Sequence, residues 1–118
     1  MARLMSVSQT VAAVELRQKT VTRRLGWRFL RAGDQLQLCR KVQGRKRGEP
    51  LHRIAMVEVV SVHREPLQYI SRGDVVREGF PHMTRDQFLD FYTTTFGVDR
   101  GTWVTRIEWR YLDNRSGS

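Results

Sequence analysis

Apolar and polar residues alternate between positions 103 and 112, and this period of two predicts a β-strand near the C-terminus. Trp103, Ile107 and Trp109 share one phase of the alternation. Because successive side chains of a strand point to opposite faces, that phase is expected to face the core. We therefore expect Trp103 and Trp109 to be buried, as large aromatic side chains usually are.

Three further segments carry strand patterns. Residues 52–63 are apolar on much of both phases, which is typical of a central strand that is covered on both sides. Shorter alternations predict strands within residues 1–8 and over residues 35–39, the latter directly after a Gly33-Asp34 turn. Cys39 is expected to be a small buried hydrophobe in this strand.

Helical signals lie between the predicted strands. Thr84 and Gln87 have the spacing of a capping box, and Gly97 suits the end of the helix that follows. Ser8 or Thr10 can cap an earlier helix. Short helical turns are also expected between the long strand and the capping box. The predicted helices therefore cover residues 11–16, 67–77 and 85–95.

The segment from Lys19 to Arg24 reads Lys-Thr-Val-Thr-Arg-Arg, which is both cationic and rich in hydroxyl groups. Its β-branched residues favour a strand, with Lys19, Val21 and Arg23 on one face and the threonines on the other. A lysine beside threonines and paired arginines can hold an anionic backbone, orient a polar base or activate a hydroxyl. A nucleotide or RNA ligand is therefore expected here.

The charge of the chain is strongly asymmetric. Its formal net charge is +9, yet residues 1–53 contain thirteen Lys or Arg and only three Asp or Glu. Residues 54–118 contain eight basic and nine acidic residues. A strongly basic half is the electrostatic footprint of a nucleic-acid-binding protein. The alternative is that the charge serves solubility alone.

Length and cysteine content predict one cytoplasmic domain. A chain of 118 residues is long enough to bury a core without disulfides, and its single cysteine cannot form an intramolecular one. Three dispersed histidines give no spacing for a metal site, so we expect neither metal nor cofactor. No apolar run has the length of a membrane span, and no membrane association is expected. The domain is expected over residues 1–113, with a disordered tail over residues 114–118.

Two other features suggest contacts with nucleic acid. A basic loop is expected between Arg40 and Pro50, either as a solvated turn or as an arm that contacts phosphate. Trp27 lies beside arginine and follows a glycine, which makes it a candidate for stacking on a base. The candidate nucleic-acid-binding residues are Arg17, Arg23, Arg24, Trp27, Arg40, Lys41, Arg45, Lys46, Arg47 and Arg53.

Several of these segments together resemble an ASCH domain, over most of the chain. They are the segment from Lys19 to Arg24, the Gly33-Asp34 turn, Val57-Glu58-Val59, the Glu78-Gly79-Phe80-Pro81 turn before a Phe-rich helix, and the strand Val104 to Trp109. The resemblance implies an α+β fold, a PUA-like small β-barrel that is mostly antiparallel and carries two or three helices. It also implies association with RNA. Short single-domain members with this ending resemble those of bacteriophages, which would place the protein in the host cytoplasm.

The ASCH signature is Gly-x-Lys-x-x-Glu-x-Arg, and it falls on residues 17–24. Arg17 stands at the glycine position and Thr22 at the glutamate position. Threonine there is similar to an enzymatic branch that includes amidohydrolases acting on N(4)-acetylcytidine. For that branch the resemblance implies catalysis by Lys19, Thr22 and a later glutamate, here Glu78.

Three functions stay open from the sequence. The leading one is an RNA-binding module, with a nucleoside or base pocket beside a basic cleft and single-stranded RNA as the partner. The second is an enzyme, either an amidohydrolase or a ribonuclease. In that case Lys19 would act as a base for Thr22 if neighbouring arginines and burial lowered its pKa. The third is a phage-encoded effector that grips a host protein or nucleic acid.

Overall fold

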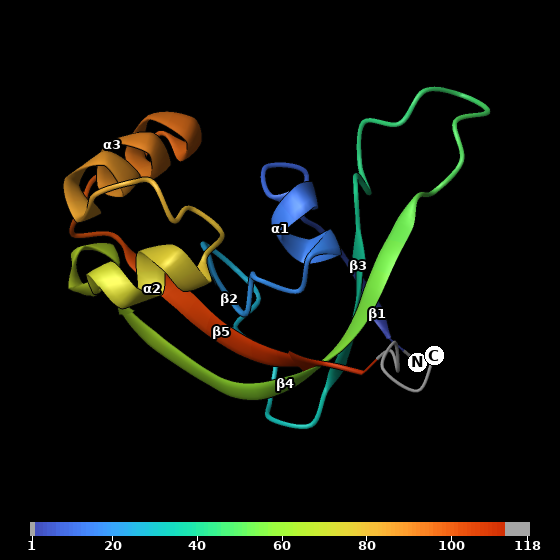
Figure 1. The fold of residues 1–118 in the computed structure, drawn as a ribbon, viewed down its shortest axis with the longest axis horizontal. Helices are drawn as coiled ribbons and strands as arrows, with labels where there is room; N and C mark the ends of the chain where they lie inside the picture. Colours follow the sequence, from blue (N-terminus) through green and yellow to red (C-terminus); the bar gives the residue numbers. More distant parts are fainter. Residues whose placement is uncertain (1, 113–118) are drawn as a thin grey trace.

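Five strands form one strongly curved sheet in the order β1-β3-β4-β5-β2 in the computed structural model, which describes residues 2–112 (Figure 1). The β1–β3 pair is parallel and the other three pairs are antiparallel. The predicted tail, residues 114–118, lies outside the described residues. The strands are β1 (Arg3–Ser6), β2 (Val21–Arg24), β3 (Gln35–Cys39), β4 (Arg53–Pro66) and β5 (Trp103–Tyr111).

The expectation of a mostly antiparallel α+β fold is confirmed, and the sheet curls into a half-barrel. β4 is the long central strand that the sequence predicts, and it continues three residues beyond His63 to Pro66. The expectation that both its faces are covered is wrong, because Ala55, Val57 and Val59 are buried whereas Val60 is 46% exposed. It pairs with β3 over its first half and with β5 along most of its length. The register shifts between Val59 and Ser61, and such bulges bend a sheet.

The helices also lie where the sequence predicts them. Thr84 and Gln87 form both reciprocal hydrogen bonds of a capping box, and Gly97 ends the helix at φ +66°. The side chain of Ser71 accepts a hydrogen bond from the backbone N–H of Asp74 and so caps a shorter helix. The elements are α1 (Val11–Glu15), the short 3₁₀ turn η1 (Leu67–Tyr69), α2 (Arg72–Arg77) and α3 (Arg85–Phe96).

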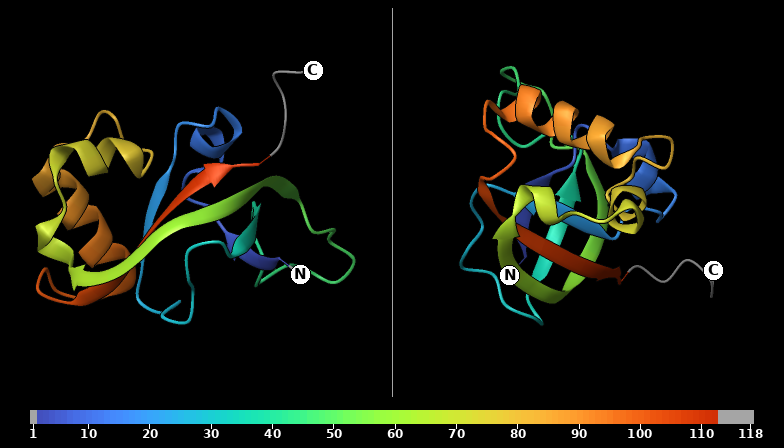
Figure 2. Two further views of the ribbon diagram at one scale, coloured as in Figure 1. Left: turned by 90° about the horizontal axis from the view of Figure 1, so that it is seen from below. Right: turned by 90° about the vertical axis from the view of Figure 1, so that its left-hand side faces the viewer.

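Two hydrophobic clusters hold these elements together. The first fills the curve of the sheet and includes Met5, Leu36 and Trp109. The second packs α2 and α3 against β5 and includes Phe88 and Val104. Figure 2 shows α2 and α3 together at one end of the sheet, whereas the β3–β4 connection extends from the other end.

Trp103 corrects the sequence analysis. Trp109 is 2% exposed, as predicted, but Trp103 is 56% exposed. Trp103 is the first residue of β5 and pairs with Pro66, the last residue of β4. The alternation correctly puts Trp103 on the same face as Ile107 and Trp109. It does not reveal that the hydrophobic cluster that buries those two residues does not extend to Trp103. Cys39 is fully buried, as expected.

The two edge strands of the sheet are β1 and β2, and we call the region between them the seam. The guanidinium of Arg24 crosses this seam, because its Nη2 donates to the backbone oxygen of Ser6 at 2.8 Å. Across residues 2–112, each helix is too short or too polar to span a lipid bilayer.

Candidate ligand pocket

A pocket of about 260 Å³ lies at the seam between β1 and β2. Its floor comes from β2 and the segments beside it, and its opposite wall comes from the aromatic face of α3. The turn between β1 and α1 closes one side. Its lining residues are Ser6, Val7, Ser8, Gln9, Thr10, Lys19, Thr22, Arg23, Arg24, Glu78, Phe80, Phe88, Phe91, Tyr92 and Phe96.

Lys19 and Glu78 meet in the floor of this pocket. The Nζ of Lys19 donates to the backbone oxygen of Glu78 at 2.6 Å and to its Oε1 at 3.3 Å. Both residues are only 3% exposed, although 58 residues separate them in the chain. Thr22 is equally buried and lines the same pocket. The structure therefore brings together the three side chains that the resemblance implies for catalysis.

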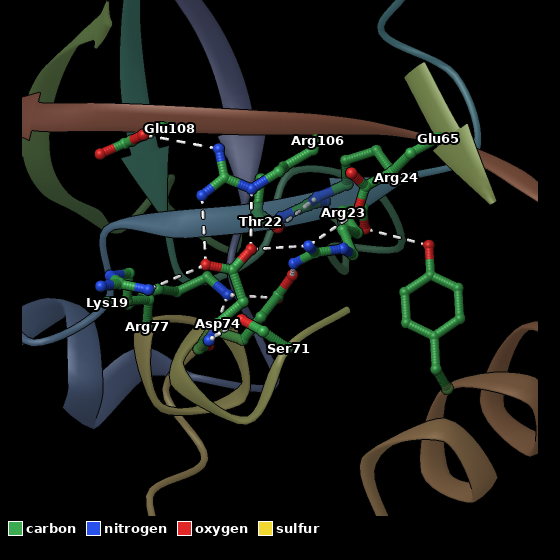
Figure 3. Close-up of polar contacts among 12 residues, drawn as sticks. Lys19, Thr22, Arg23, Arg24, Glu65, Ser71, Asp74, Arg77, Arg106 and Glu108 are labelled. Atoms are coloured by element: carbon green, nitrogen blue, oxygen red, sulfur yellow. Dashed lines mark hydrogen bonds and ion pairs between the residues drawn. The ribbon is translucent and has the colours of Figure 1, made fainter. Parts of the chain in front are cut away.

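Arg23 lies in the floor, with carboxylates around its guanidinium (Figure 3). Its Nη1 donates to Glu78 Oε2 at 3.1 Å, and its Nη2 contacts Asp74 Oδ2 at 2.6 Å and Glu65 Oε2 at 2.9 Å. Only 1% of its side chain is exposed. Two of its guanidinium nitrogens are thus occupied by carboxylates, and the contact from Nη1 holds the Glu78 carboxylate in place.

Asp74 anchors the other end of this network. It accepts hydrogen bonds from Arg106 Nε at 2.7 Å and from Arg77 Nη1 at 3.1 Å, in addition to the contact with Arg23. Burial alone would raise the pKa of the Asp74 carboxyl, but the hydrogen bonds from Arg106 and Arg23 hold it well below its usual range. Asp74 therefore stays ionised and keeps Arg23 in place.

The charge state of Lys19 is shifted by its surroundings. Burial lowers the pKa of its ammonium, and the nearby charges of Arg24 and Arg23 lower it further. The carboxylate of Glu78 opposes this effect without cancelling it. Lys19 is thus easier to deprotonate than an exposed lysine, which is the property required of a lysine that takes up a proton during a reaction.

Thr22 presents its hydroxyl group beside Arg24. The Nε of Arg24 donates to Thr22 Oγ1 at 3.1 Å, so one lone pair of the hydroxyl is occupied. The hydroxyl can still donate its proton to a ligand or a base. Arg24 therefore has two roles in this geometry, because it orients Thr22 and bridges the seam to Ser6.

Aromatic rings form the wall opposite this polar floor. The ring centroids of Tyr92 and Phe96 are 4.5 Å apart, and those of Phe80 and Phe91 are 5.1 Å apart. The hydroxyl of Tyr92 donates to the backbone oxygen of Arg23 at 3.0 Å and so ties the wall to the floor. Burial raises the pKa of this phenol well above its usual range, and the charge of Glu78 adds to the effect. Tyr92 is therefore a neutral hydrogen-bond donor.

Comparison with solved structures agrees with this architecture. The chain superimposes on an ASCH domain from Lactobacillus crispatus JV V101 with a TM-score of 0.64 and 13% identity, over 87% of this chain and 70% of the other. The chain has the ASCH-domain fold. A protein from Enterococcus faecalis V583, described by the family model DUF984, gives a TM-score of 0.67 and 12% identity over 98% and 83% of the two chains. At the level of sequence, no family model and no curated protein matches.

Arg17 has a backbone conformation that suits the glycine of the ASCH signature. This residue stands at the signature glycine and has φ +62°, a left-handed conformation that glycine adopts without strain. Its Nη1 donates to the backbone oxygens of Val14 and Glu15, and its guanidinium lies 5.1 Å from the ring centre of Tyr111. Arg17 is outside the pocket lining and turns the chain from α1 toward Lys19.

The other predicted contact residues are dispersed. Trp27 is half-buried and packs against the cluster inside the sheet, with its ring centre 5.5 Å from that of Phe29. The basic loop, residues 40–50, projects from the end of the sheet opposite α2 and α3 (Figure 1). Arg53 follows it at the start of β4. The structure thus separates these residues from the pocket floor, and their contacts with nucleic acid stay predictions.

Sequence analysis missed three parts of the site. Asp74 had a local signal, since Ser71 and Asp74 have the spacing of a helix cap, but the cap does not reveal the arginines that Asp74 binds. Tyr92 lies within the helix predicted over residues 85–95 and Phe96 directly after it, but no local pattern indicates that their rings line a pocket. Ser6 contributes a backbone oxygen, for which a sequence carries no signal.

Proposed function

We propose that the protein binds RNA by taking one unstacked base, with its nucleoside, into the pocket at the β1–β2 seam. The observation that carries this proposal is the arrangement of an aromatic wall opposite a buried polar floor. Bases splayed out of single-stranded RNA stack on aromatic side chains and form hydrogen bonds along their edges. The ASCH-domain fold, which the sequence resemblance associates with RNA, supports the same ligand class.

The size and polarity of the pocket favour a small ligand. Its volume of about 260 Å³ lies below the roughly 300–1,000 Å³ of pockets that take drug-sized molecules. A base entering it meets the ammonium of Lys19 and the hydroxyl of Thr22 as donors, and the carboxylate of Glu78 as an acceptor. A paired base cannot enter, so single-stranded RNA is expected to bind better than duplex RNA.

Phe96 allows this proposal to be tested, because it lines the pocket yet is 46% exposed, so its loss spares the core. Replacing it in Phe96→Ala is expected to weaken binding of a fluorescein-labelled single-stranded RNA by about 5- to 150-fold, the effect of losing one stacking ring. Tyr69→Ala is the control, since Tyr69 is 69% exposed and lies outside the pocket. Equal affinity of the two variants, measured by fluorescence anisotropy, would refute the proposal.

A second function is favoured by the lowered pKa of Lys19. We infer that a bound N(4)-acylated cytidine would place its amide near Lys19, Thr22 and Glu78. Neutral Lys19 would accept the proton of the attacking oxygen, from Thr22 or from a water, and return it to the departing amine. If Thr22 attacks, a water then hydrolyses the acyl-threonine ester and restores the hydroxyl; if water attacks, the acid leaves directly. The products are cytidine and a carboxylate in both cases. The same groups leave ribonuclease activity open as an alternative.

Acetate release from N(4)-acetylcytidine, and cleavage of labelled single-stranded RNA, test the enzymatic proposals. Turnover by the wild-type protein that is lost in Lys19→Met and retained in part in Thr22→Ser would support catalysis. Thr22→Val is the matched control, because it keeps the shape of the threonine side chain and removes its hydroxyl group. Absence of both reactions in the folded wild-type protein would contradict the enzymatic proposals and leave the binding function.

A further inference from the structure

A second hollow lies between β4 and the β2–β3 loop (residues 25–34). It is an open groove of about 530 Å³. Hydrogen bonds hold the loop beside the strand, since Gly33 N donates to Val59 O at 2.8 Å and Val59 N donates to Asp34 O at 2.7 Å. The shape of the groove is therefore fixed by backbone hydrogen bonds between the loop and β4.

The lining of this groove is cationic. Arg28 and Arg31 come from the β2–β3 loop and Arg64 comes from β4, whereas the His63 ring that also lines the groove is hydrogen-bonded to Glu65 Oε1 at 2.8 Å. Within residues 2–112, its lining contains neither aspartate nor glutamate. Ser61 and Thr105 add hydroxyl groups. A concave surface of one charge sign raises the local concentration of ligands of the opposite sign.

The arginines of this groove differ from Arg23 in the pocket floor. Arg28 and Arg31 are exposed, and neither side chain has an ion pair or hydrogen bond within the described part of the chain. Arg64 donates to Thr105 Oγ1 at 2.9 Å, which fixes its position without neutralising its charge. By contrast, Arg23 is neutralised by three carboxylates. The groove thus retains cations that are available to an anionic partner.

A cross-strand row connects the groove to the pocket. Arg24 of β2 pairs with Thr105 of β5, which pairs in turn with Arg64 of β4. Directly paired residues share one face of a sheet, and neighbouring strands are about 4.8 Å apart. Arg24 lines the pocket and Arg64 lines the groove. About 10 Å of sheet therefore separates them, a span that a short oligonucleotide can cover.

The basic loop is the competing surface for a phosphate backbone. It carries more charge, but part of that charge is paired. Lys41 Nζ lies 3.6 Å from Glu49 Oε1, and the same carboxylate accepts a hydrogen bond from the backbone of Lys46. The loop also projects away from the helical end that covers the pocket (Figure 2).

We infer that the Arg28-Arg31-Arg64 groove holds the phosphate backbone of the RNA strand whose base enters the pocket. This inference rests on the proposed RNA-binding function and deepens it. The occupant is a single strand, because the groove lies about 10 Å along the sheet from a pocket that takes an unpaired base.

Matched double variants test this inference. Arg28→Ala with Arg31→Ala removes two exposed arginines of the groove, and Arg45→Ala with Arg47→Ala removes two exposed arginines of the basic loop. Binding of a labelled single-stranded RNA is measured by anisotropy across a salt series. Each lost phosphate contact lowers the slope of log affinity against log salt by about 0.7, so the groove variant should lose about 1.4 in slope. The loop variant should keep the wild-type slope.

The possible outcomes separate this inference from the function on which it rests. Loss of slope in the loop variant alone, or an equal loss in both variants, would overturn the groove and leave RNA binding intact. Absence of RNA binding by the wild-type protein at low salt would overturn both. Arg64→Gln is a third variant, and thermal unfolding checks that it folds. Unchanged slopes in this folded variant and in the groove variant would also contradict the inference.

Discussion

Asp74 offers the sharpest test of how the pocket floor is held together. Asp74 is only 6% exposed, and its carboxylate binds the guanidinium groups of Arg23, Arg106 and Arg77. Asp74→Asn preserves the shape of the side chain but leaves Arg23 and Arg106 short of an anion. Breaking a buried ion pair by removing one partner costs about 3–5 kcal/mol. We expect a loss near 3 kcal/mol, because 53% of the Arg77 side chain is exposed and returns to water.

The stability lost in Asp74→Asn should depend on pH, and the direction of this dependence follows from the lowered pKa of Asp74. The pKa of Asp74 is lowered on folding from the usual 3.8, so the unfolded chain binds the proton first as pH falls. The stability that Asp74 contributes is complete above that value and is lost progressively below it. The difference in free energy of unfolding between wild type and Asp74→Asn should therefore be largest near neutral pH and shrink in acid.

Urea denaturation followed by circular dichroism measures both effects. Asp86→Asn is the matched control, because the Asp86 side chain is 74% exposed and its pairs with arginine lie at the surface. Its loss should cost less than about 1 kcal/mol. If Asp74→Asn were as stable as Asp86→Asn at neutral pH, or if its deficit persisted unchanged in strong acid, the reasoning on the network would be refuted.

Three further predictions concern other parts of the same framework. Tyr92→Phe should lower the free energy of unfolding by about 1 kcal/mol through loss of the hydrogen bond to Arg23 O, whereas Tyr69→Phe, at an exposed position, should not change it; urea denaturation compares them. Gly97→Ala should cost about 1 kcal/mol because the residue has φ +66°, and Gly101→Ala, which carries no such strain, is its control in thermal unfolding; equal melting temperatures would contradict this. The pKa of Lys19 is lowered on folding, so the free energy of unfolding of the wild-type protein should rise as pH increases from that lowered pKa toward 10.5. Denaturation curves at alkaline pH should show no such rise for Lys19→Met. An identical pH dependence of the two proteins would show that the pKa of Lys19 is not perturbed.

The sequence predicts most of the fold because its local signals are strong. Alternation from Trp103 onward fixes β5, and the Thr84 capping box together with Gly97 fixes both ends of α3. These signals depend on neighbours within a few residues. The exposure of Trp103 does not, because it is decided by where the underlying cluster ends.

The pocket could be predicted only in part, for a related reason. The ASCH resemblance brought Lys19, Thr22 and Glu78 together, and the structure places them in one floor. The partners of Arg23 could not be predicted, because they lie 42 to 55 residues away and charge alone does not select among the acidic residues. Arg23 therefore looked like a phosphate ligand in the sequence and is a buried ion-pair residue in the structure.

The most direct test of the account is an NMR search for nuclear Overhauser effects between a bound single-stranded RNA and the protein. The account predicts contacts from the protons of one base to the rings of Phe96 and Phe91 and to the methyl group of Thr22, with the methyl groups of Val42 in the basic loop unaffected. Contacts to Val42 without any to the pocket, in an RNA that binds tightly, would contradict it.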